Sequence, residues 1–384
     1  MSTHDDVVYL DHAAATPLDP AVLKAMQPYL TERFYNPSAT YKEAQAVHAD
    51  LESARAGVAH WLGAKPTEII FTAGGTEANN LAIRGVMEQF PEGNVVVSSI
   101  EHESVLAAAG ACKHSMAPVT PEGIVDVAQL EKLLDDATVL ISVMYANNEV
   151  GTVQPIRRIT QLAEAIRQKR AKSGNKLPLY VHTDAAQAAG FLDLHAARLG
   201  VDMLTINAGK IYGPRQVGAL YVQSHVILAP QMLGGGQERG LRSGTENVAG
   251  AVGMRVALDI AQEPRQREAK RLQDLQAYFI TQLQQALASV RINGSRKLRL
   301  PNNVHVTIPG IDNERVIFQL DDRGVICAAG SACSADSGEP SHVLRAMGLS
   351  DDDARASLRF TMGRDTTKKD IDHTVQALVS SIVP

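Results

Sequence analysis

The stretch that decides the fold lies between Val181 and Pro214 and contains two motifs, Val-His-Thr-Asp-Ala-Ala-Gln at residues 181–187 and Ala-Gly-Lys-Ile-Tyr-Gly-Pro at residues 208–214. Asp184 lies in the first motif and Lys210 in the second. A lysine amine forms a Schiff base with an aldehyde cofactor, and a carboxylate beside the ring nitrogen of pyridoxal phosphate keeps that nitrogen protonated. Either residue alone would be an ordinary strand end or a solvated lysine, but together they indicate a pyridoxal phosphate site.

The composition of the 384-residue chain is that of an ordinary globular protein. Its length suits two domains, or one large domain with a small additional one. Hydrophobic residues make up 45% and charged residues 21%, which excludes wholesale disorder and fibrous repeats. The net charge of −5 and the lack of a basic stripe argue against a nucleic-acid partner.

The N-terminus and the cysteines bear on cellular location. No apolar signal core follows the acidic N-terminus, and no run of about 18 apolar residues occurs, so we expect a cytoplasmic protein with no membrane partner. Cys112, Cys327 and Cys333 lack the spacing of a disulfide framework or a metal site, so we expect reduced thiols and no metal.

Short β-branched or apolar runs alternate with longer helical patterns, which predicts an α/β fold with a largely parallel sheet covered on both faces. The predicted strands are residues 69–72, 95–98, 139–144, 179–182, 203–206 and 219–222. His102, Asn148 and Asp184 each follow one of these strands, at the edge where ligands bind in open α/β sheets. We therefore expect them to share a site.

The pattern changes near Pro264, where a charged amphipathic helix runs through Gln285. Strands are predicted near residues 304–308, 325–327 and 357–361, which indicates a smaller α+β domain. The first 15 residues run extended and could join either part. We assign residues 16–262 to a large cofactor-binding domain, and residues 1–15 and 263–384 to the small domain.

Several polar residues could contact the cofactor. The segment from Phe71 to Leu81 reads as a strand, a glycine turn and a helix start capped by Thr76, where free N–H groups favour a phosphate, although a plain tight turn fits equally well. His102 could lie flat on the ring and relay protons. Asn148 and Gln187 could donate to the phenolic oxygen, although Asn-Asn is also ordinary turn chemistry.

A thiol and an arginine complete the candidates. Cys333 lies among small and polar residues, which predicts a mobile loop with a reactive thiol, whereas Cys327 and Cys112 are expected to be structural. Arg359 alternates with apolar residues, and its planar fork suits a carboxylate in a cleft, although such an arginine can also face water.

In this order, the motifs resemble those of the cysteine desulfurases of the NifS/IscS type, pyridoxal phosphate enzymes of the class-V aminotransferase family. The likeness spans nearly the whole chain and implies fold type I, with a mostly parallel seven-stranded sheet in the large domain. The matching motifs are Tyr9-Leu10-Asp11, Asn36-Pro37-Ser38, Gly75-Thr76-Glu77, Glu101-His102, Asn147-Asn148-Glu149, Asp184-Ala185-Ala186-Gln187, Lys210-Ile211-Tyr212-Gly213-Pro214, Gly234-Gly235-Gly236-Gln237-Glu238, Arg242-Ser243-Gly244-Thr245, Gly330-Ser331-Ala332-Cys333, Glu339-Pro340-Ser341 and Arg359-Phe360.

The resemblance implies a role for each residue around the cofactor ring. It makes Lys210 the lysine that bonds the cofactor and Asp184 the partner of the ring nitrogen. It makes His102 the acid–base that stacks on the ring. Asn148 and Gln187 become the contacts to the phenolic oxygen.

The remaining roles concern the phosphate and the substrate. Gly75 and Thr76 would hold the phosphate, and Thr245 would reach the phosphate of the neighbouring subunit in a homodimer. Asn36 and Arg359 would grip the substrate carboxylate.

The implied reaction converts L-cysteine to L-alanine and leaves the sulfur on Cys333 as a persulfide. The Cys333 loop has the longer form of the IscS and NifS group, not the short form of the SufS group. The sulfur would pass to an acceptor protein for iron–sulfur clusters, thio-cofactors or tRNA. The alternatives are a selenocysteine lyase or an aminotransferase of the same fold, and a degenerate homologue that binds a partner without catalysis.

One motif departs from the family pattern. The family usually has Ser-x-His-Lys before the cofactor lysine, where this chain has Asn207-Ala208-Gly209-Lys210. Losing a donor to a charged group costs about 1.5–3 kcal/mol, so we predict weakened cofactor affinity with retained chemistry. Asn207 still offers an amide donor, and Gly209 could bring its backbone N–H closer. The chain also ends at Pro384, and we expect it to lack the tail by which housekeeping relatives dock the scaffold.

Overall fold

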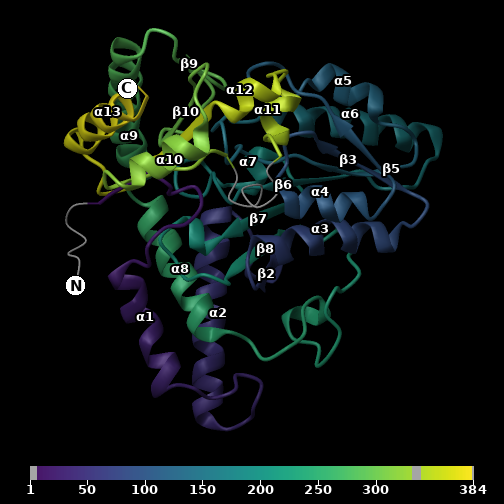
Figure 1. Ribbon diagram of the computed structural model, residues 1–384. Coiled ribbons are helices and arrows are strands. Elements are labelled where there is room, and N and C mark those ends of the chain that lie inside the picture. The colour runs from purple at the N-terminus through teal and green to yellow at the C-terminus, as the bar shows by residue number, and fades with distance from the viewer. Residues whose placement is uncertain (1–6, 331–338, 383–384) are drawn as a thin grey trace.

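A seven-stranded sheet forms the centre of the computed structural model, which describes residues 7–330 and 339–382 (Figure 1). The strand order is β2-β8-β7-β6-β5-β3-β4, and only β8 runs antiparallel to its neighbours among these described strands. The strands are β2 Ile69–Thr72, β3 Asn94–Ser98, β4 His114–Ala117, β5 Thr138–Ser142, β6 Tyr180–Asp184, β7 Met203–Asn207 and β8 Gly218–Val222.

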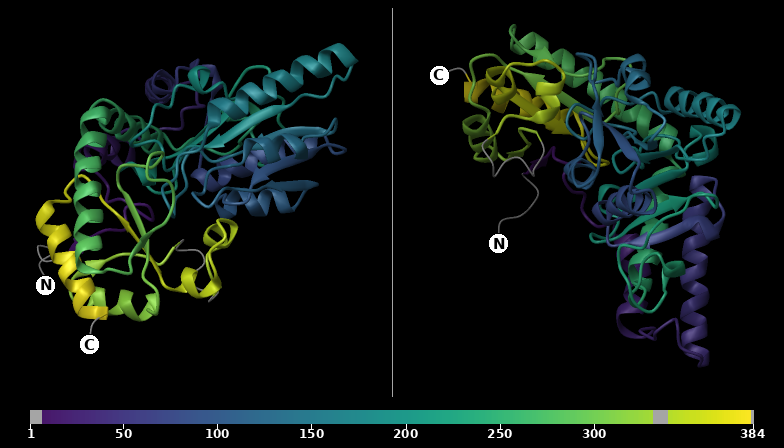
Figure 2. Two further views of the ribbon diagram at one scale, coloured as in Figure 1. Left: turned by 90° about the horizontal axis from the view of Figure 1, so that it is seen from above. Right: turned by 90° about the vertical axis from the view of Figure 1, so that its right-hand side faces the viewer.

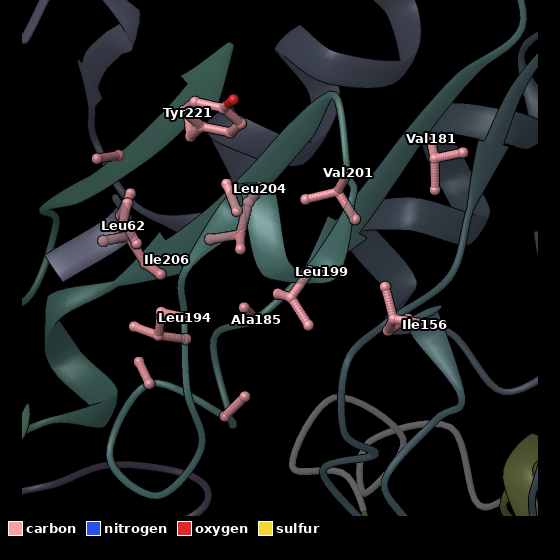
Figure 3. Packing of buried hydrophobic residues seen from close by; sticks show 14 of the residues in the cluster. Leu62, Ile156, Val181, Ala185, Leu194, Leu199, Val201, Leu204, Ile206 and Tyr221 are labelled. Atoms are coloured by element: carbon pink, nitrogen blue, oxygen red, sulfur yellow. The ribbon is translucent and has the colours of Figure 1, made fainter. Parts of the chain in front are cut away.

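Both faces of this sheet are buried, which explains why its strands read as continuous apolar runs. Successive side chains of a strand point to opposite faces. In β3, Val95 and Val97 enter the core formed with α3 and α4, whereas Val96 enters the core on the other face. Figure 3 shows part of that second core, in which Leu204 and Ile206 of β7 also lie.

Helices and short 3-10 turns connect the strands and cover the sheet. The helices are α1 Pro20–Thr31, α2 Lys42–Leu62, α3 Gly75–Gln89, α4 Glu103–Gly110, α5 Val127–Leu133, α6 Ile156–Ser173, α7 Ala196–Leu199, α8 Val248–Gln262, α9 Arg265–Ala286, α10 Asn313–Asp321, α11 His342–Ala346, α12 Asp351–Arg355 and α13 Lys368–Ile382. The 3-10 turns are η2 Pro66–Glu68, η3 Ala208–Lys210 and η4 Glu238–Gly240. Within the described ranges, no helix combines the length and apolar character needed to span a bilayer.

The C-terminal part contains a small antiparallel sheet in the order β12-β10-β9, packed against α9 and α13 (Figure 2). Its strands are β9 Arg291–Ile292, β10 Asn303–Thr307 and β12 Ser357–Thr361. These agree with the predicted α+β character of this region.

The start of the described chain joins the C-terminal part. β1 Val8–Tyr9 pairs in parallel with β11 Val325–Ile326, and Leu10 packs in the core of the C-terminal region. Thr361 bonds this segment through several groups. Its N–H donates to Leu10 O (2.7 Å), its carbonyl accepts the N–H of His12 (3.3 Å), and its hydroxyl accepts the N–H of Ala13 (2.9 Å). The predicted domain boundaries at residues 15/16 and 262/263 stay a prediction.

β4 is the one strand of the central sheet that was not predicted. It lies at the edge next to β3, and its residues His114 and Met116 are exposed. An edge strand of four residues with little apolar burial leaves no strong periodic signal.

Candidate active site

A cavity of about 200 Å³ lies where the parallel strands of the central sheet end, and Arg359 of β12 closes it from the C-terminal part. It brings together many of the predicted site residues, which are Gly75, Thr76, His102, Asn148, Asp184, Gln187, Asn207, Lys210 and Arg359. The shared site expected for His102, Asn148 and Asp184 therefore exists as a cavity.

Four predicted residues are not among those lining the cavity. Asn36 and Thr245 are exposed, and among the described residues the carboxamide of Asn36 accepts only the local N–H of Ser38 (2.9 Å). Gly209 lies beside the cavity, next to Lys210. Cys333 lies outside the described residues.

Asp184 ends β6 with its carboxylate fixed by two donors. Ala186 N donates to Oδ1 (2.9 Å), and Asn79 Nδ2 donates to Oδ2 (2.7 Å). Asp184 is only 8% exposed and lines the cavity, so its charge acts in a largely water-free setting. Asn79, a buried residue of α3, was not predicted, because a polar residue inside a helix gives no sequence signal of its own.

A hydrogen-bond chain links this carboxylate to His102. Asn79 Nδ2 also donates to Ser104 Oγ (2.9 Å), which lies 2.9 Å from His102 Nδ1. His102 caps α4, and its Nδ1 accepts the N–H of Ser104 (3.1 Å). Because Nδ1 is the acceptor, the neutral imidazole carries its proton on Nε2.

Lys210 lies in η3 with its amine turned toward the N-terminal segment. Its Nζ donates to the carbonyls of Ala13 (2.8 Å) and Ala14 (2.7 Å). Gln187 Nε2 also donates to Ala13 O (3.0 Å), so the amide predicted to meet the cofactor's phenolic oxygen is engaged here. The Ala13-Ala14 turn had no predicted role.

Arg359 lies at the other end of the cavity and is only 2% exposed. Its Nη2 forms an ion pair with Asp11 Oδ1 (2.7 Å), and its Nη1 donates to Asn148 O (3.1 Å). Asp11 was matched to the family without a role, and the structure shows that it orients the arginine proposed for the substrate.

Gly74, Gly75, Thr76 and Asn207 form the end where a phosphate is predicted. Gly74 caps α3 at φ 117°, a conformation that favours glycine, and open space lies where its side chain would be. The first N–H groups of a helix have no acceptor within the helix and favour an anion. These donors and this space fit the phosphate of the predicted cofactor.

In this structure the backbone N–H of Gly209, suggested as a phosphate donor, is already engaged. Its N–H already donates to Asn207 Oδ1 (3.1 Å), and its carbonyl accepts the hydroxyl of Thr16 (3.1 Å). Asn207 therefore uses its carbonyl oxygen to cap η3, which leaves its Nδ2 as the group that can donate to a phosphate.

Two buried titratable groups lie behind the cavity. Burial raises the pKa of Glu101 to about 8, and its Oε1 accepts bonds from Ser98 Oγ and Met144 N (2.8 Å). Burial lowers the pKa of His182 to about 4, and its ring bonds the hydroxyls of Ser142 (2.8 Å) and Thr205 (3.0 Å). Both groups are therefore neutral near pH 7, so neither of them places a charge near Asp184.

The sequence matches the family described as Aminotransferase class-V over residues 8–374. The chain belongs to the class-V aminotransferase family. Among its relatives, a cysteine desulfurase IscS of Dictyoglomus turgidum is 41% identical over 378 residues, which cover 97% of this chain and 93% of the relative. Membership of the class-V aminotransferases confirms the predicted family and pyridoxal 5'-phosphate as the cofactor.

Solved structures of the same fold agree with this assignment. A structure described as a NifS-like protein has a TM-score of 0.89 at 32% identity and covers 97% of this chain and 98% of its own. Another, described as SspA in complex with cysteine, has a TM-score of 0.78 at 34% identity and covers 92% and 98%. The predicted fold type I with its mostly parallel seven-stranded sheet is confirmed.

Proposed function

We propose that this protein is a pyridoxal-phosphate-dependent cysteine desulfurase, which converts L-cysteine to L-alanine and transfers the sulfur to Cys333. One observation carries the proposal, namely that Lys210, Asp184 and Arg359 line a single cavity. They supply an amine for the aldehyde, a carboxylate for the ring nitrogen and a guanidinium for the substrate carboxylate. The activity named for the Dictyoglomus relative, which matches nearly the whole chain, supports the same function.

Some of the residues that line the cavity suit the ring of the cofactor, and others suit its phosphate. Lys210 would bond the aldehyde carbon, and Asp184 would accept the ring N–H. His102 would lie against the ring, with Asn148 and Gln187 near the phenolic oxygen. The residues proposed for the phosphate are Gly75, Thr76 and Asn207.

When bound, the cofactor supplies an electron sink that weakens the bonds at the substrate Cα. Once the substrate amine replaces it at the aldehyde, the released Lys210 amine would take the proton from Cα and could return it, because η3 holds this side chain at the cavity. His102 carries a proton on Nε2 and can donate it to the substrate side of the cavity. Arg359 binds the substrate carboxylate, with Asp11 and Asn148 O holding its orientation.

The sulfur step is proposed for Cys333 from its sequence position. Its thiolate attacks the substrate sulfur, the bond between that sulfur and the substrate Cβ breaks, and the carbon gains a proton. The products are a persulfide on Cys333 and L-alanine. Cys327 does not suit this role, because burial raises the pKa of its thiol to about 12.

The proposal extends to assembly and partners. A homodimer would bring Thr245 of one subunit to the phosphate of the other. This is supported by exposed apolar side chains in the same segment and before α2, where Leu233 is 84% and Phe34 69% exposed. A sulfur-acceptor protein of iron–sulfur assembly or a sulfur relay would take the persulfide, in the cytoplasm.

The deciding experiment measures L-alanine and sulfide formed from L-cysteine with added cofactor. The wild-type protein should form both, and Lys210→Ala and Cys333→Ser should form neither. If Cys333→Ser still forms both products, the sulfur step proposed for Cys333 is wrong. If the wild-type protein binds the cofactor but forms neither product, it is an aminotransferase of the same fold. If no cofactor absorption band forms with cofactor in excess, it is a homologue that binds without catalysis.

A further inference from the structure

The phosphate end of the cavity has little positive charge of its own. Besides the imidazole of His102, the basic side chains that line the described cavity are Lys210, held at two carbonyls, and Arg359, paired with Asp11. A phosphate ester carries roughly −1.5 to −2 charges at neutral pH, and a helix N-terminus offers only about half a positive charge. The charge of a bound phosphate must therefore be balanced in part by side chains outside this cavity.

A second cavity of about 640 Å³ lies behind that wall and shares Gly75, Thr76 and Asn207 with the first. Its lining includes Glu77, a carboxylate in the first turn of α3. An unpaired carboxylate at this place would repel a phosphate bound at the same helix start.

Glu77 is paired, and the partner is Arg242. Arg242 Nε donates to Glu77 Oε1 at 2.9 Å, and Ala73 N donates to Oε2 at 2.8 Å. Both side chains are largely buried, with 22% and 15% exposed, so salt screens their attraction less than at an open surface. Arg242 thus cancels the one acidic charge lining this cavity among the described residues.

The fold holds Arg242 in this position. It belongs to the segment between β8 and α8, which is drawn in green below α3 in Figure 1. The segment is tied to β2 by Glu238, whose carboxylate accepts two bonds from the buried Arg55 (2.7 and 2.8 Å) and one from Phe71 N (2.8 Å). Arg242 follows on the same tethered segment.

We propose that Arg242 is a positioning residue for the cofactor phosphate: by neutralising Glu77 it allows the start of α3 to accept a doubly charged anion. The inference rests on the proposed function, because it concerns the cofactor of that site. It also identifies a source of positive charge for a chain that has Asn207 and Gly209 where its family has serine and histidine.

The test titrates the apo-protein with pyridoxal phosphate and, separately, with pyridoxal, which lacks the phosphate, and follows the absorption change. Arg242→Gln should weaken pyridoxal phosphate binding roughly tenfold or more and change pyridoxal binding by less than about twofold. Adding Glu77→Gln to Arg242→Gln should restore most of the lost affinity, because no uncompensated carboxylate is left.

Arg84→Gln is the matched control. Arg84 lines the same cavity but pairs with Glu88 at an exposed site, so its loss should leave both affinities near wild type. Unchanged pyridoxal phosphate binding in Arg242→Gln overturns the inference. So does an equal loss for both ligands, or a double variant as weak as the single one. A wild-type protein that binds neither ligand contradicts the proposed function instead.

Discussion

Replacing Asn79 with leucine tests whether this residue, which was not among the predicted site residues, supports the carboxylate of Asp184. Leucine is close to asparagine in size but has no polar atoms. Asn79 is 1% exposed, and its amide donates to both Asp184 Oδ2 (2.7 Å) and Ser104 Oγ (2.9 Å). The Asn79→Leu change therefore removes one of the two donors that the Asp184 carboxylate has among the described residues, and it breaks the chain of bonds to His102.

The structure sets the expected size of the effect. A hydrogen bond to a charged group contributes about 1.5–3 kcal/mol, and the Asp184 carboxylate that would lose this bond is only 8% exposed. Because 1.4 kcal/mol corresponds to a tenfold change, kcat/KM for L-cysteine should fall by roughly ten- to hundredfold. The same loss should reduce the free energy of unfolding by about 1–3 kcal/mol.

The assay measures alanine formation at saturating cofactor, together with urea unfolding of the same preparation. Asn80→Leu is the control, since Asn80 is the next residue of α3 and, in the part of the chain that the structure describes, its amide donates only to Thr76 O (2.9 Å). An Asn79→Leu protein with wild-type kcat/KM would refute the role given to Asn79. Equal losses in both variants would show a general effect on α3 instead.

Three further outcomes are expected. Burial raises the pKa of Glu101 to about 8, so the folded protein keeps a proton that the unfolded chain loses above about pH 4.5, and stability falls as the pH rises from about 4.5 to 8. Glu101→Gln should flatten this part of the urea-unfolding profile, and an unchanged slope would contradict it. Burial lowers the pKa of His305 to about 3, so stability is lost as the pH falls from about 6.5 toward 3; His305→Gln should move acid unfolding to lower pH, and the same midpoint would count against this. Because Asn207 and Gly209 replace serine and histidine, dialysis should remove the cofactor faster than from a relative with Ser-x-His-Lys, and equal retention would show that affinity is not weakened.

The central sheet was predictable because its strands are buried on both faces and separated by helices. The β-branched runs of β3 and β5 carry that signal directly. The antiparallel direction of β8 has no such local signal, because it follows from pairing with β7 and β2, which are distant in sequence.

The cavity was predictable only in part. Residues directly after strands, such as His102 and Asp184, could be found because strand ends share one edge of the sheet. Asn79 and Asp11 act through contacts with residues far along the chain, and spacing does not reveal such contacts. The bond from the Gly209 N–H to Asn207 Oδ1 could not be predicted either, because a backbone N–H has no visible partner until the turn is folded.

The bonds between Thr361 and the first described residues have a consequence for biosynthesis. The ribosome makes Ala13 and Ala14 long before Thr361, yet Thr361 fixes the backbone whose carbonyls accept bonds from the Lys210 amine. The two can meet only after β12 has left the exit tunnel. Vitamin B6 capture therefore follows the synthesis of β12, and a nascent chain stalled before β12 cannot trap the coenzyme in its final binding site.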